Sequence, residues 1–248
     1  MVGVGIDISE RRQLERALRQ SNQELERFAD VSAHHLMEPA RRLATFSQRL
    51  RVNLAGRVDD PDALLSLDFI EDQAQRLRVL LRDIQLYLVA DRTLGETEAV
   101  DADRIVHAVV EQMAEPIREA GATITLEKLP PALIDAPRLS NLFSILLENA
   151  LQYRCTDLPS AIRIEGSEIN CVVQYRVIDN GCGIPAQYRE RVYQVFERLH
   201  PGSNQDSTGI GLSIVRRIVT TRDGRTWIEE TPGGGTTVII ELPAGASL

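Results

Sequence analysis

Several residue types are scarce in this 248-residue sequence, and each scarcity excludes a class of protein. The three cysteines, Cys155, Cys171 and Cys182, have no CxxC spacing, which argues against a disulfide framework or zinc site and favours reduced thiols in a cytosolic setting. Aromatic residues make up only 4% of the chain, which argues against single-strand recognition by base stacking. The net charge of -8 argues against nucleic-acid binding, which needs a basic face.

Long apolar runs and targeting segments are also missing. No stretch of about 18 apolar residues occurs, so the sequence predicts no membrane-spanning helix. No charged-then-apolar signal peptide opens the chain, and together with the cysteine usage this predicts a cytoplasmic location. Hydrophobic residues still make up 43% of the sequence, enough for one large or two ordinary domains with their own cores.

The first residues predict a short strand followed by a long helix. Residues 2–8 (VGVGIDI) alternate like a strand, and Ser9 is placed to cap a helix that begins at Glu10. Two apolar lines at seven-residue spacing favour a parallel two-stranded coiled coil, with a plain amphipathic helix as the alternative because serines interrupt both lines. The lines are Leu14, Ser21 and Phe28, and Leu18, Leu25 and Ser32.

This helix is expected to continue to about Leu54 and to carry two histidines in different environments. At about 100° per residue, His34 projects away from the apolar stripe toward solvent, whereas His35 lies on the flank of the stripe. His34 is therefore in a position to react with a ligand, whereas His35 is in a position to pack against neighbouring side chains. Pro39 is expected to kink the helix. The stripe consists of Phe28, Ser32, Leu36, Pro39, Leu43, Phe46 and Leu50.

A second helix is expected after a polar turn over residues 55–61. Its apolar face consists of Ile70, Ala74, Leu77, Leu81, Ile84 and Leu88. Two long helices joined by a short loop form an antiparallel hairpin. A lone hairpin leaves its apolar stripe half covered, so we expect two chains to pair as a homodimer with a four-helix bundle.

From about Thr97 the pattern changes to a mixture of helices and strands, which predicts an α/β sandwich. Helices are expected over residues 101–120, 137–153 and 209–221, and strands over residues 122–126, 161–169, 171–178, 226–229 and 236–242. The fold class predicted for the whole chain is therefore α+β and multi-domain.

Glycine clusters mark the chemistry of this second half. Residues 179–185 (DNGCGIP) close a strand, and residues 207–212 (STGIGL) directly precede an apolar helix. Either cluster alone predicts only a turn, but bare backbone N–H groups at a helix N-terminus favour phosphate. A third cluster, residues 232–236 (PGGGT), bridges two strands and is expected to be a hairpin turn.

With three further motifs, these clusters resemble the catalytic core of sensor histidine kinases, whose nucleotide lobe is shared with gyrase-type ATPases. The resemblance covers about residues 10–243. In family order the motifs are AHHLMEP at 33–39 (histidine box), LLENALQY at 146–153 (asparagine box), DNGCGIP, YQVFERL at 193–199 (phenylalanine box) and STGIGL. The opening residues 3–13 resemble the end of a PAS sensor domain, so we expect a fragment of a longer receptor or a natural chain with a shortened input.

The resemblance implies a domain order and a set of site residues. The segments are the end of a PAS-like domain (1–9), a coiled-coil signalling helix (10–27), a dimerisation and histidine phosphotransfer domain (28–95) and a catalytic ATP-binding domain (96–248). His34 matches the phosphoacceptor, Asn149 the Mg²⁺ ligand beside the ATP phosphates, and Asp179 the carboxylate that accepts from the adenine amino group. The other implied nucleotide contacts are Tyr153, Gly181, Gly183, Thr208, Gly209, Ile210, Gly211 and Leu212, with residues 197–207 as a mobile lid.

The sequence departs from the family pattern at four positions. His35 stands where relatives have an acid that orients the phosphoacceptor imidazole, so it can accept a hydrogen bond but provides no fixed charge. Glu38 stands where phosphatase-competent relatives have Thr or Asn, which predicts weak phosphatase activity. Ile145 and Gln152 replace a polar residue and a phosphate-contacting lysine of the asparagine box, which lowers the expected ATP affinity.

Three functions follow as hypotheses. The leading one is ATP- and Mg²⁺-dependent autophosphorylation on His34, with transfer to an aspartate of a response regulator, for which the ATP-binding lobe must swing toward the histidine. A degenerate kinase that acts as a dimeric interaction module is the alternative, supported by His35, Ile145 and Gln152. An ATPase or chaperone is the third, and it is disfavoured because Ile145 stands where such hydrolases need a Glu base.

Overall fold

The computed structural model describes residues 36–54, 60–90, 99–155, 157–199 and 207–245. The chain divides into two compact units, Met1–Leu88 and Val89–Leu248, which are described separately. The strand, coiled coil and both histidines predicted within residues 1–35 lie outside the described residues and stay predictions.

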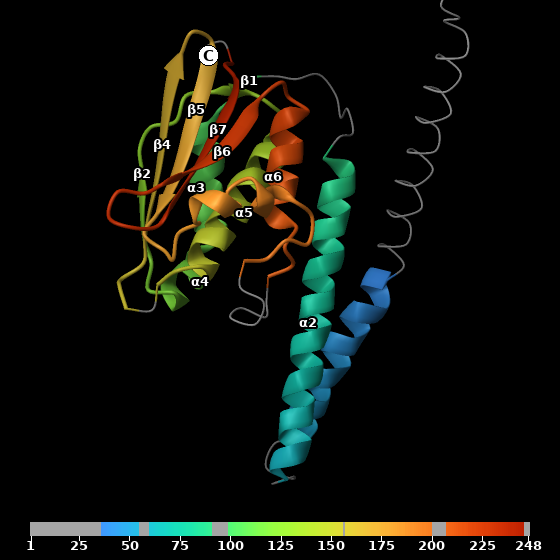
Figure 1. Cartoon of the computed structure of the whole chain (residues 1–248). Coiled ribbons are helices and arrows are strands. Elements are labelled where there is room, and N and C mark those ends of the chain that lie inside the picture. Colours follow the sequence, from blue (N-terminus) through green and yellow to red (C-terminus); the bar gives the residue numbers. More distant parts are fainter. Residues whose placement is uncertain (1–35, 55–59, 91–98, 156, 200–206, 246–248) are drawn as a thin grey trace, which may run out of the picture. The chain divides into compact units, whose positions relative to one another are not determined.

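The N-terminal unit contains the predicted antiparallel helical hairpin (Figure 1). One helix covers residues 36–54 and continues through Pro39, and the other is α2 (Pro61–Val89). Asp60 starts α2, because its side chain accepts from the Asp62 N–H at 3.1 Å and its carbonyl from the Leu64 N–H at 3.1 Å.

The seam of the hairpin differs from the one predicted. Ala40 and Leu81 are buried against each other, and Ser47 is buried on the same helix as Ala40. The predicted stripe is instead exposed in the single chain, at Leu36 (52%), Leu43 (53%), Phe46 (62%) and Leu50 (48%). Met37 and Ile84 pack against Ala40 and Leu81, so the seam combines a small residue with larger apolar ones and leaves these four residues outside.

Helix α2 shows the same division between a buried seam and an uncovered face. Ala74, Leu81 and Leu88 are buried as predicted, at seven-residue spacing. Ile70 and Leu77, which were predicted on the same face, are 46% and 37% exposed. Among the helices that the structure describes, none is long and apolar enough to cross a membrane.

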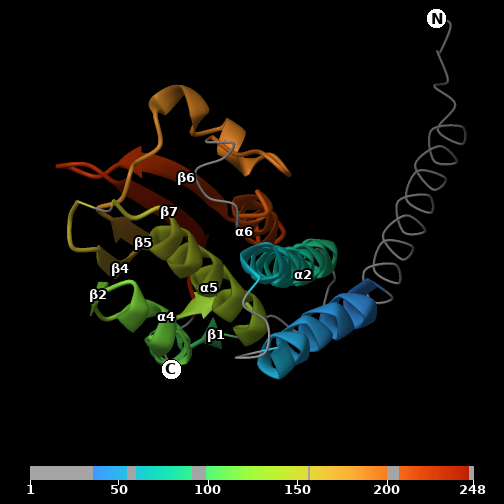
Figure 2. The same cartoon turned by 90° about the horizontal axis from the view of Figure 1, so that it is seen from below.

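The C-terminal unit is the predicted α/β sandwich. A five-stranded sheet in the order β2-β4-β5-β7-β6 has β2 parallel to β4 and all other neighbours antiparallel. Its strands are β2 (Thr123–Leu126), β4 (Ala161–Ile169), β5 (Val172–Asp179), β6 (Arg225–Glu230) and β7 (Thr236–Pro243). Figures 1 and 2 show helices α3 (Ala102–Gln112), α5 (Ala136–Gln152) and α6 (Gly211–Thr220) on one face of this sheet.

The core lies between α5 and the central strands. Alternate residues of β5, Val173, Tyr175 and Val177, are buried, as expected for a strand with one covered face. Phe143 of α5 meets the Tyr175 ring edge-on with centroids 5.5 Å apart, and the Tyr175 hydroxyl donates to the Pro130 carbonyl at 2.5 Å. Helix α5 is therefore held firmly on the sheet, and its last turn reaches the strand end at which β5 stops.

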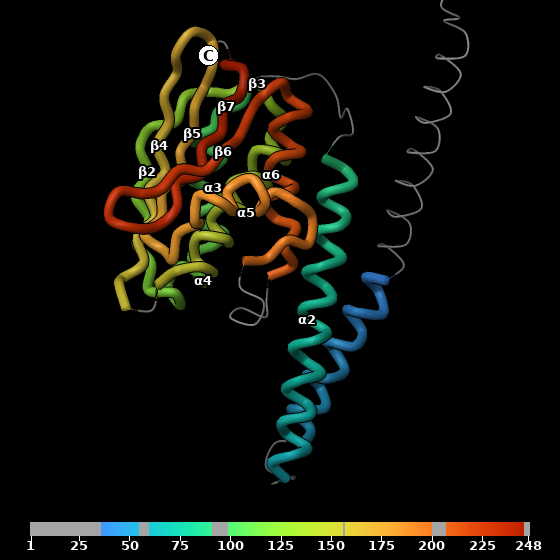
Figure 3. Tube along the Cα trace, viewed as in Figure 1, coloured from blue at the N-terminus to red at the C-terminus, as the bar shows by residue number. Residues whose placement is uncertain are grey.

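Three local features differ from the sequence expectation. The helix predicted over residues 101–120 breaks at Met113 into α3 and α4 (Ala114–Glu119), because Pro116 lacks an N–H and fits only the first turn of a new helix. The short strands β1 (Ala99–Val100) and β3 (Ala132–Leu133) pair with each other and are too short to show a pattern. Between β5 and α6, a path that Figure 3 follows, two 3₁₀ turns occur at η1 (Ala186–Tyr188) and η2 (Arg191–Tyr193).

Candidate functional site

Asp179, the last residue of β5, is the buried acid of the site. Its Oδ1 accepts from the Gly181 N–H at 2.8 Å and from the Thr236 N–H at 3.0 Å. Burial raises the pKa of this carboxyl group, although both backbone N–H groups act to lower it. Among the described residues, both hydrogen bonds reach Oδ1, so Oδ2 is left for a ligand that donates a hydrogen bond.

The glycines that follow Asp179 let the chain pass close to the end of α5. A Cβ on Gly181 would lie 2.4 Å from the Tyr153 carbonyl oxygen, and the Cys182 N–H donates to the same oxygen at 3.0 Å. Gly183 has φ +73° and faces Gly235, so neither loop glycine can carry a side chain without strain. The loop thus offers bare backbone next to a buried carboxylate.

Asn149, in the last turn of α5, is the second polar group of the site. Its Nδ2 is buried and has no hydrogen-bond partner among the described residues. A Cβ on Gly211 would lie 3.7 and 3.8 Å from the two amide atoms of Asn149, and 3.0 Å from Ile145 Cγ2. A buried amide nitrogen without a partner among the described residues is suited to a polar ligand, and the start of α6 lies directly beside it.

The loop that leads into α6 provides backbone donors. Gly209 has φ +72°, and the Ile210 N–H contacts Thr208 Oγ1 at 3.3 Å. Gly211 and Leu212 form the first turn of α6, where backbone N–H groups lack intrahelical partners and attract anions. The Ser207 hydroxyl is also buried without a partner within the described residues.

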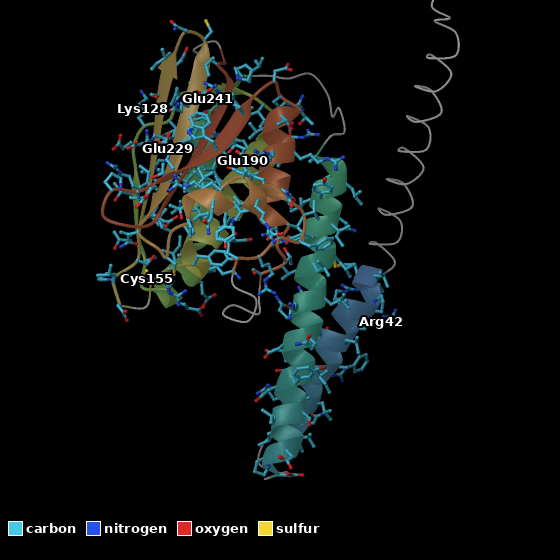
Figure 4. The ribbon with its side chains drawn as sticks, in the orientation of Figure 1. Arg42, Lys128, Cys155, Glu190, Glu229 and Glu241 are labelled. Atoms are coloured by element: carbon cyan, nitrogen blue, oxygen red, sulfur yellow. The ribbon has the colours of Figure 1, made fainter. Side chains whose placement is uncertain are left out.

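The segment before this loop is fastened to the rest of the domain. The Phe196 N–H donates to the Gly209 carbonyl at 2.9 Å. Glu190, labelled in Figure 4, pairs with Arg216 at 2.7 Å, and the Arg216 guanidinium lies 4.2 Å from the centre of the Tyr193 ring. Burial raises the pKa of Tyr193 to about 12, so its hydroxyl stays neutral beside Thr226. Most of the predicted lid, residues 200–206, lies outside the described residues.

The structure brings together the predicted nucleotide-contacting residues of the C-terminal unit. Tyr153 caps the C-terminus of α5 with its side chain 39% exposed, beside the glycine loop. His34 and His35 lie outside the described residues, and Glu38 belongs to the other unit. There, hydrogen bonds from Arg42 and then Arg41 lower the pKa of the Glu38 carboxyl group.

Sequence reasoning missed the contribution of the third glycine cluster. Residues 232–236 do join β6 to β7 as predicted, but they also support Asp179. A Cβ on Gly235 would lie 2.0 Å from the Asp179 carbonyl oxygen, and the next residue donates its N–H to the carboxylate. A hairpin turn needs fewer than three adjacent glycines, so this run could have indicated from the sequence that the turn has a further role.

Comparison with known proteins agrees with this geometry. Residues 134–246 match the family described as histidine kinase-, DNA gyrase B-, and HSP90-like ATPase. The chain is 30% identical to phytochrome-like protein Cph1 of Synechocystis sp., over 94% of this chain and 31% of that protein. It is also 30% identical to the methanogenesis regulatory histidine kinase FilI of Methanothrix harundinacea, over 90% of this chain and 25% of that protein. The chain thus spans less than a third of the length of either relative.

Solved structures share the fold over most of the chain. Full-length ShkA, in a complex with AMPPNP, superposes with a TM-score of 0.67 at 20% identity, over 90% of this chain and 47% of that chain. The histidine kinase ThkA, in a complex with the response regulator protein TrrA, superposes with a TM-score of 0.63 at 21% identity. The match covers 97% of this chain and 68% of that chain. Residues 134–246 thus match the histidine kinase-, DNA gyrase B-, and HSP90-like ATPases, and nearly the whole chain is similar in sequence to part of longer proteins that include a histidine kinase.

Proposed function

We propose that the chain is an ATP- and Mg²⁺-dependent autokinase that phosphorylates its own His34 and passes the phosphoryl group to an aspartate on the receiver domain of a response regulator. The observation that carries this proposal is the meeting of three groups at one end of the sheet. They are the buried Asp179 carboxylate, the Asn149 amide, whose Nδ2 has no partner among the described residues, and the glycine-led start of α6.

These groups suit the parts of ATP. The Asp179 carboxylate can accept from the adenine amino group, and the backbone of Gly181 and Gly183 can approach the base closely. The N–H groups of Gly209 to Gly211 suit phosphate oxygens. The Asn149 amide would hold Mg²⁺ through its oxygen, since the two ends of an amide exchange by a flip. When bound, Mg²⁺ neutralises charge on the transferring phosphate.

The acceptor side of the reaction belongs to the other unit. A neutral imidazole at His34 is a competent nucleophile near pH 7. His35 would orient it by hydrogen bonding, without the fixed charge of an acid. Glu38 remains an ion held by Arg41 at 2.8 Å and Arg42 at 2.9 Å, and we propose that a carboxylate there supports little phosphatase activity. Because the two units carry separate halves of the site, transfer requires that they meet.

The uncovered faces of both hairpin helices support the homodimer. Their exposed apolar residues form a surface that a second hairpin can bury, which gives the four-helix bundle. These residues include Leu36, Leu43, Phe46, Leu50, Phe69, Ile70 and Leu77. An upstream sensor domain joined through the helix that the sequence predicts before His34 would complete a receptor, as the coverage of the longer relatives suggests.

A degenerate kinase remains the second candidate, and Ile145 is the observation that favours it. This residue is 5% exposed and lies against Gly211, one turn before Asn149. An apolar side chain there can neither contact phosphate nor act as a base. The same fact speaks against the water-activating ATPase, which needs a carboxylate at this turn.

Autophosphorylation with γ-labelled ATP and Mg²⁺ tests the proposal. We expect acid-labile, base-stable label on the wild-type chain and on His35→Gln at a reduced rate, and none on His34→Gln or Asn149→Ala. Asn141→Ala, two turns earlier on α5, is the matched control and should retain labelling. Nucleotide binding without any label would favour the degenerate kinase, and steady phosphate release without label would favour the ATPase.

A further inference from the structure

Two of the three cysteines lie together beside the glycine loop. The Sγ atoms of Cys155 and Cys182 are 3.9 Å apart, although 27 positions separate the residues in the sequence. Cys155, labelled in Figure 4, follows the end of α5, and Cys182 stands between the two loop glycines. Cys155 is half-buried and Cys182 is exposed, so a small oxidant can reach the pair.

Backbone contacts keep the two thiols neighbours. The Cys182 N–H donates to the Tyr153 carbonyl at 3.0 Å, and its Sγ lies 3.8 Å from the Arg154 carbonyl oxygen. A disulfide needs the sulfurs to approach to about 2.05 Å. Rotation of the exposed Cys182 side chain, with a small shift of its loop, supplies that approach.

We propose that Cys155 and Cys182 form a reversible dithiol–disulfide site that is oxidised by a hydroperoxide, and that the disulfide weakens nucleotide binding. The thiol pair itself is independent of the kinase activity, whereas its effect on nucleotide rests on the function proposed above.

The chemistry balances with the hydroperoxide as the oxidant. The thiolate of Cys155 attacks the peroxide oxygen, so that an S–O bond forms, the O–O bond breaks and the leaving oxygen takes a proton as water or alcohol. The Cys182 sulfur then attacks the sulfenic acid, so that the S–S bond forms and water leaves with the second thiol proton. Partial desolvation of the Cys182 sulfur, the Cys155 thiol and the Asp179 carboxylate raise the pKa of Cys182, so we assign Cys182 the second, resolving step.

The disulfide would act on the nucleotide through Gly181. The N–H of this glycine donates to Asp179 Oδ1 at 2.8 Å, and a Cβ added to it would lie 2.4 Å from the Tyr153 carbonyl oxygen. Pulling the adjacent Cys182 toward the end of α5 moves that N–H and so misorients the carboxylate. Reduction by a dithiol should restore the loop.

Cys171 provides a matched control within the same domain. It is exposed and lies in the turn before β5, whereas Asp179 ends that strand. An eight-residue strand is about 25 Å long, so Cys171 cannot reach the other two thiols within one chain.

The test treats the full chain with hydrogen peroxide or with dithiothreitol, maps linked peptides by mass and titrates a fluorescent ADP analogue. We expect a Cys155–Cys182 peptide in the wild type and in Cys171→Ser, none in Cys155→Ser, and an affinity lowered about tenfold by oxidation and restored by reduction. An unlinked pair, or a linked pair with unchanged affinity, overturns the proposal. A linked pair whose reduced chain binds no nucleotide overturns the proposed kinase and the effect on nucleotide, but leaves the thiol site standing.

Discussion

At the scale of single residues, Asp179 joins segments that are distant in the sequence. Its carboxylate accepts from Gly181 in the loop after β5 and from Thr236 at the start of β7. Its carbonyl oxygen lies against Gly235. The Asp179 side chain is buried and its pKa is raised, so the charge state of its carboxyl group controls whether the site can accept a hydrogen bond from a ligand.

Nucleotide affinity should therefore depend on pH. The raised pKa of Asp179 means that the carboxyl gains its proton at a higher pH than an ordinary aspartate. Protonation of Asp179 therefore stabilises the folded state at pH values below the pKa that this group has in the unfolded chain. This contribution to the free energy of unfolding is lost as pH rises through the pKa of Asp179 in the folded state. Ligand binding runs in the opposite direction, because adenine needs the ionised acceptor, so affinity should fall as pH drops from about 7 toward 4.

The measurement is a titration of the ADP analogue across that pH range. Asp179→Asn should bind about tenfold more weakly at neutral pH, since hydrogen bonds to charged groups contribute about 1.5–3 kcal/mol. Its affinity should also vary little with pH. Equal pH profiles for both proteins would show that another group controls binding.

The turn glycines offer a second test at the residue scale. Gly233 and Gly235 have φ +93° and +109°, so alanine is strained at both. Only at Gly235 would the new Cβ meet protein, 2.0 Å from the Asp179 carbonyl oxygen. Gly235→Ala should abolish detectable nucleotide binding or unfold the domain, whereas Gly233→Ala should bind like the wild type. Equal nucleotide binding by the two variants would show that the turn does not contribute to the site.

At the scale of elements, α5 connects the core to the site. Its first turn is capped by Asp135, which accepts from the Arg138 N–H at 3.1 Å and pairs with the Arg138 side chain at 2.6 Å and with Arg222 at 3.0 Å. Its last turn presents Asn149. The position of the amide thus depends on a helix that is fixed at its opposite end.

Removing the Asp135 side chain should destabilise the domain more than removing a helix cap that forms only one hydrogen bond. Asp135→Ala leaves the buried Arg138 without its carboxylate, at a cost of about 3 kcal/mol. Asp101 caps α3 through one bond, to the Arg104 N–H at 3.0 Å, so Asp101→Ala should cost about 1 kcal/mol. Urea unfolding followed by the fluorescence of Trp227, the single tryptophan, measures both. Equal losses would mean that the ion pairs add nothing.

At the scale of the whole molecule, the uncovered hairpin faces predict self-association. Phe46→Glu places a charge at an apolar position that is 62% exposed in the single chain, and it should convert a dimer into a monomer. Gln48→Glu adds the same charge at an exposed polar position and should remain dimeric. Sedimentation velocity distinguishes the two masses. A monomeric wild type, or a dimeric Phe46→Glu, would contradict the four-helix bundle.

Local patterns determined much of this protein. Helical periodicity located α2 and α5, alternation located β4, β5 and β7, and glycine clusters located the loops of the site with small shifts at their ends. These signals act over a few neighbouring residues, so the sequence carries them directly. Asn149 and Asp179 were predicted as site residues from the resemblance of short motifs to those of a known family, and their roles stay proposals.

Other features depended on tertiary structure. The packing of Ala40 against Leu81, the contact of Gly235 with Asp179 and the approach of Cys155 to Cys182 all join residues that are distant in the sequence. Composition and local spacing do not show which distant residues come into contact, and the spacing of the cysteines even argued against a disulfide. The order of the strands and the packing of the helices determine these contacts, because only the fold of the whole domain brings distant segments of the chain side by side.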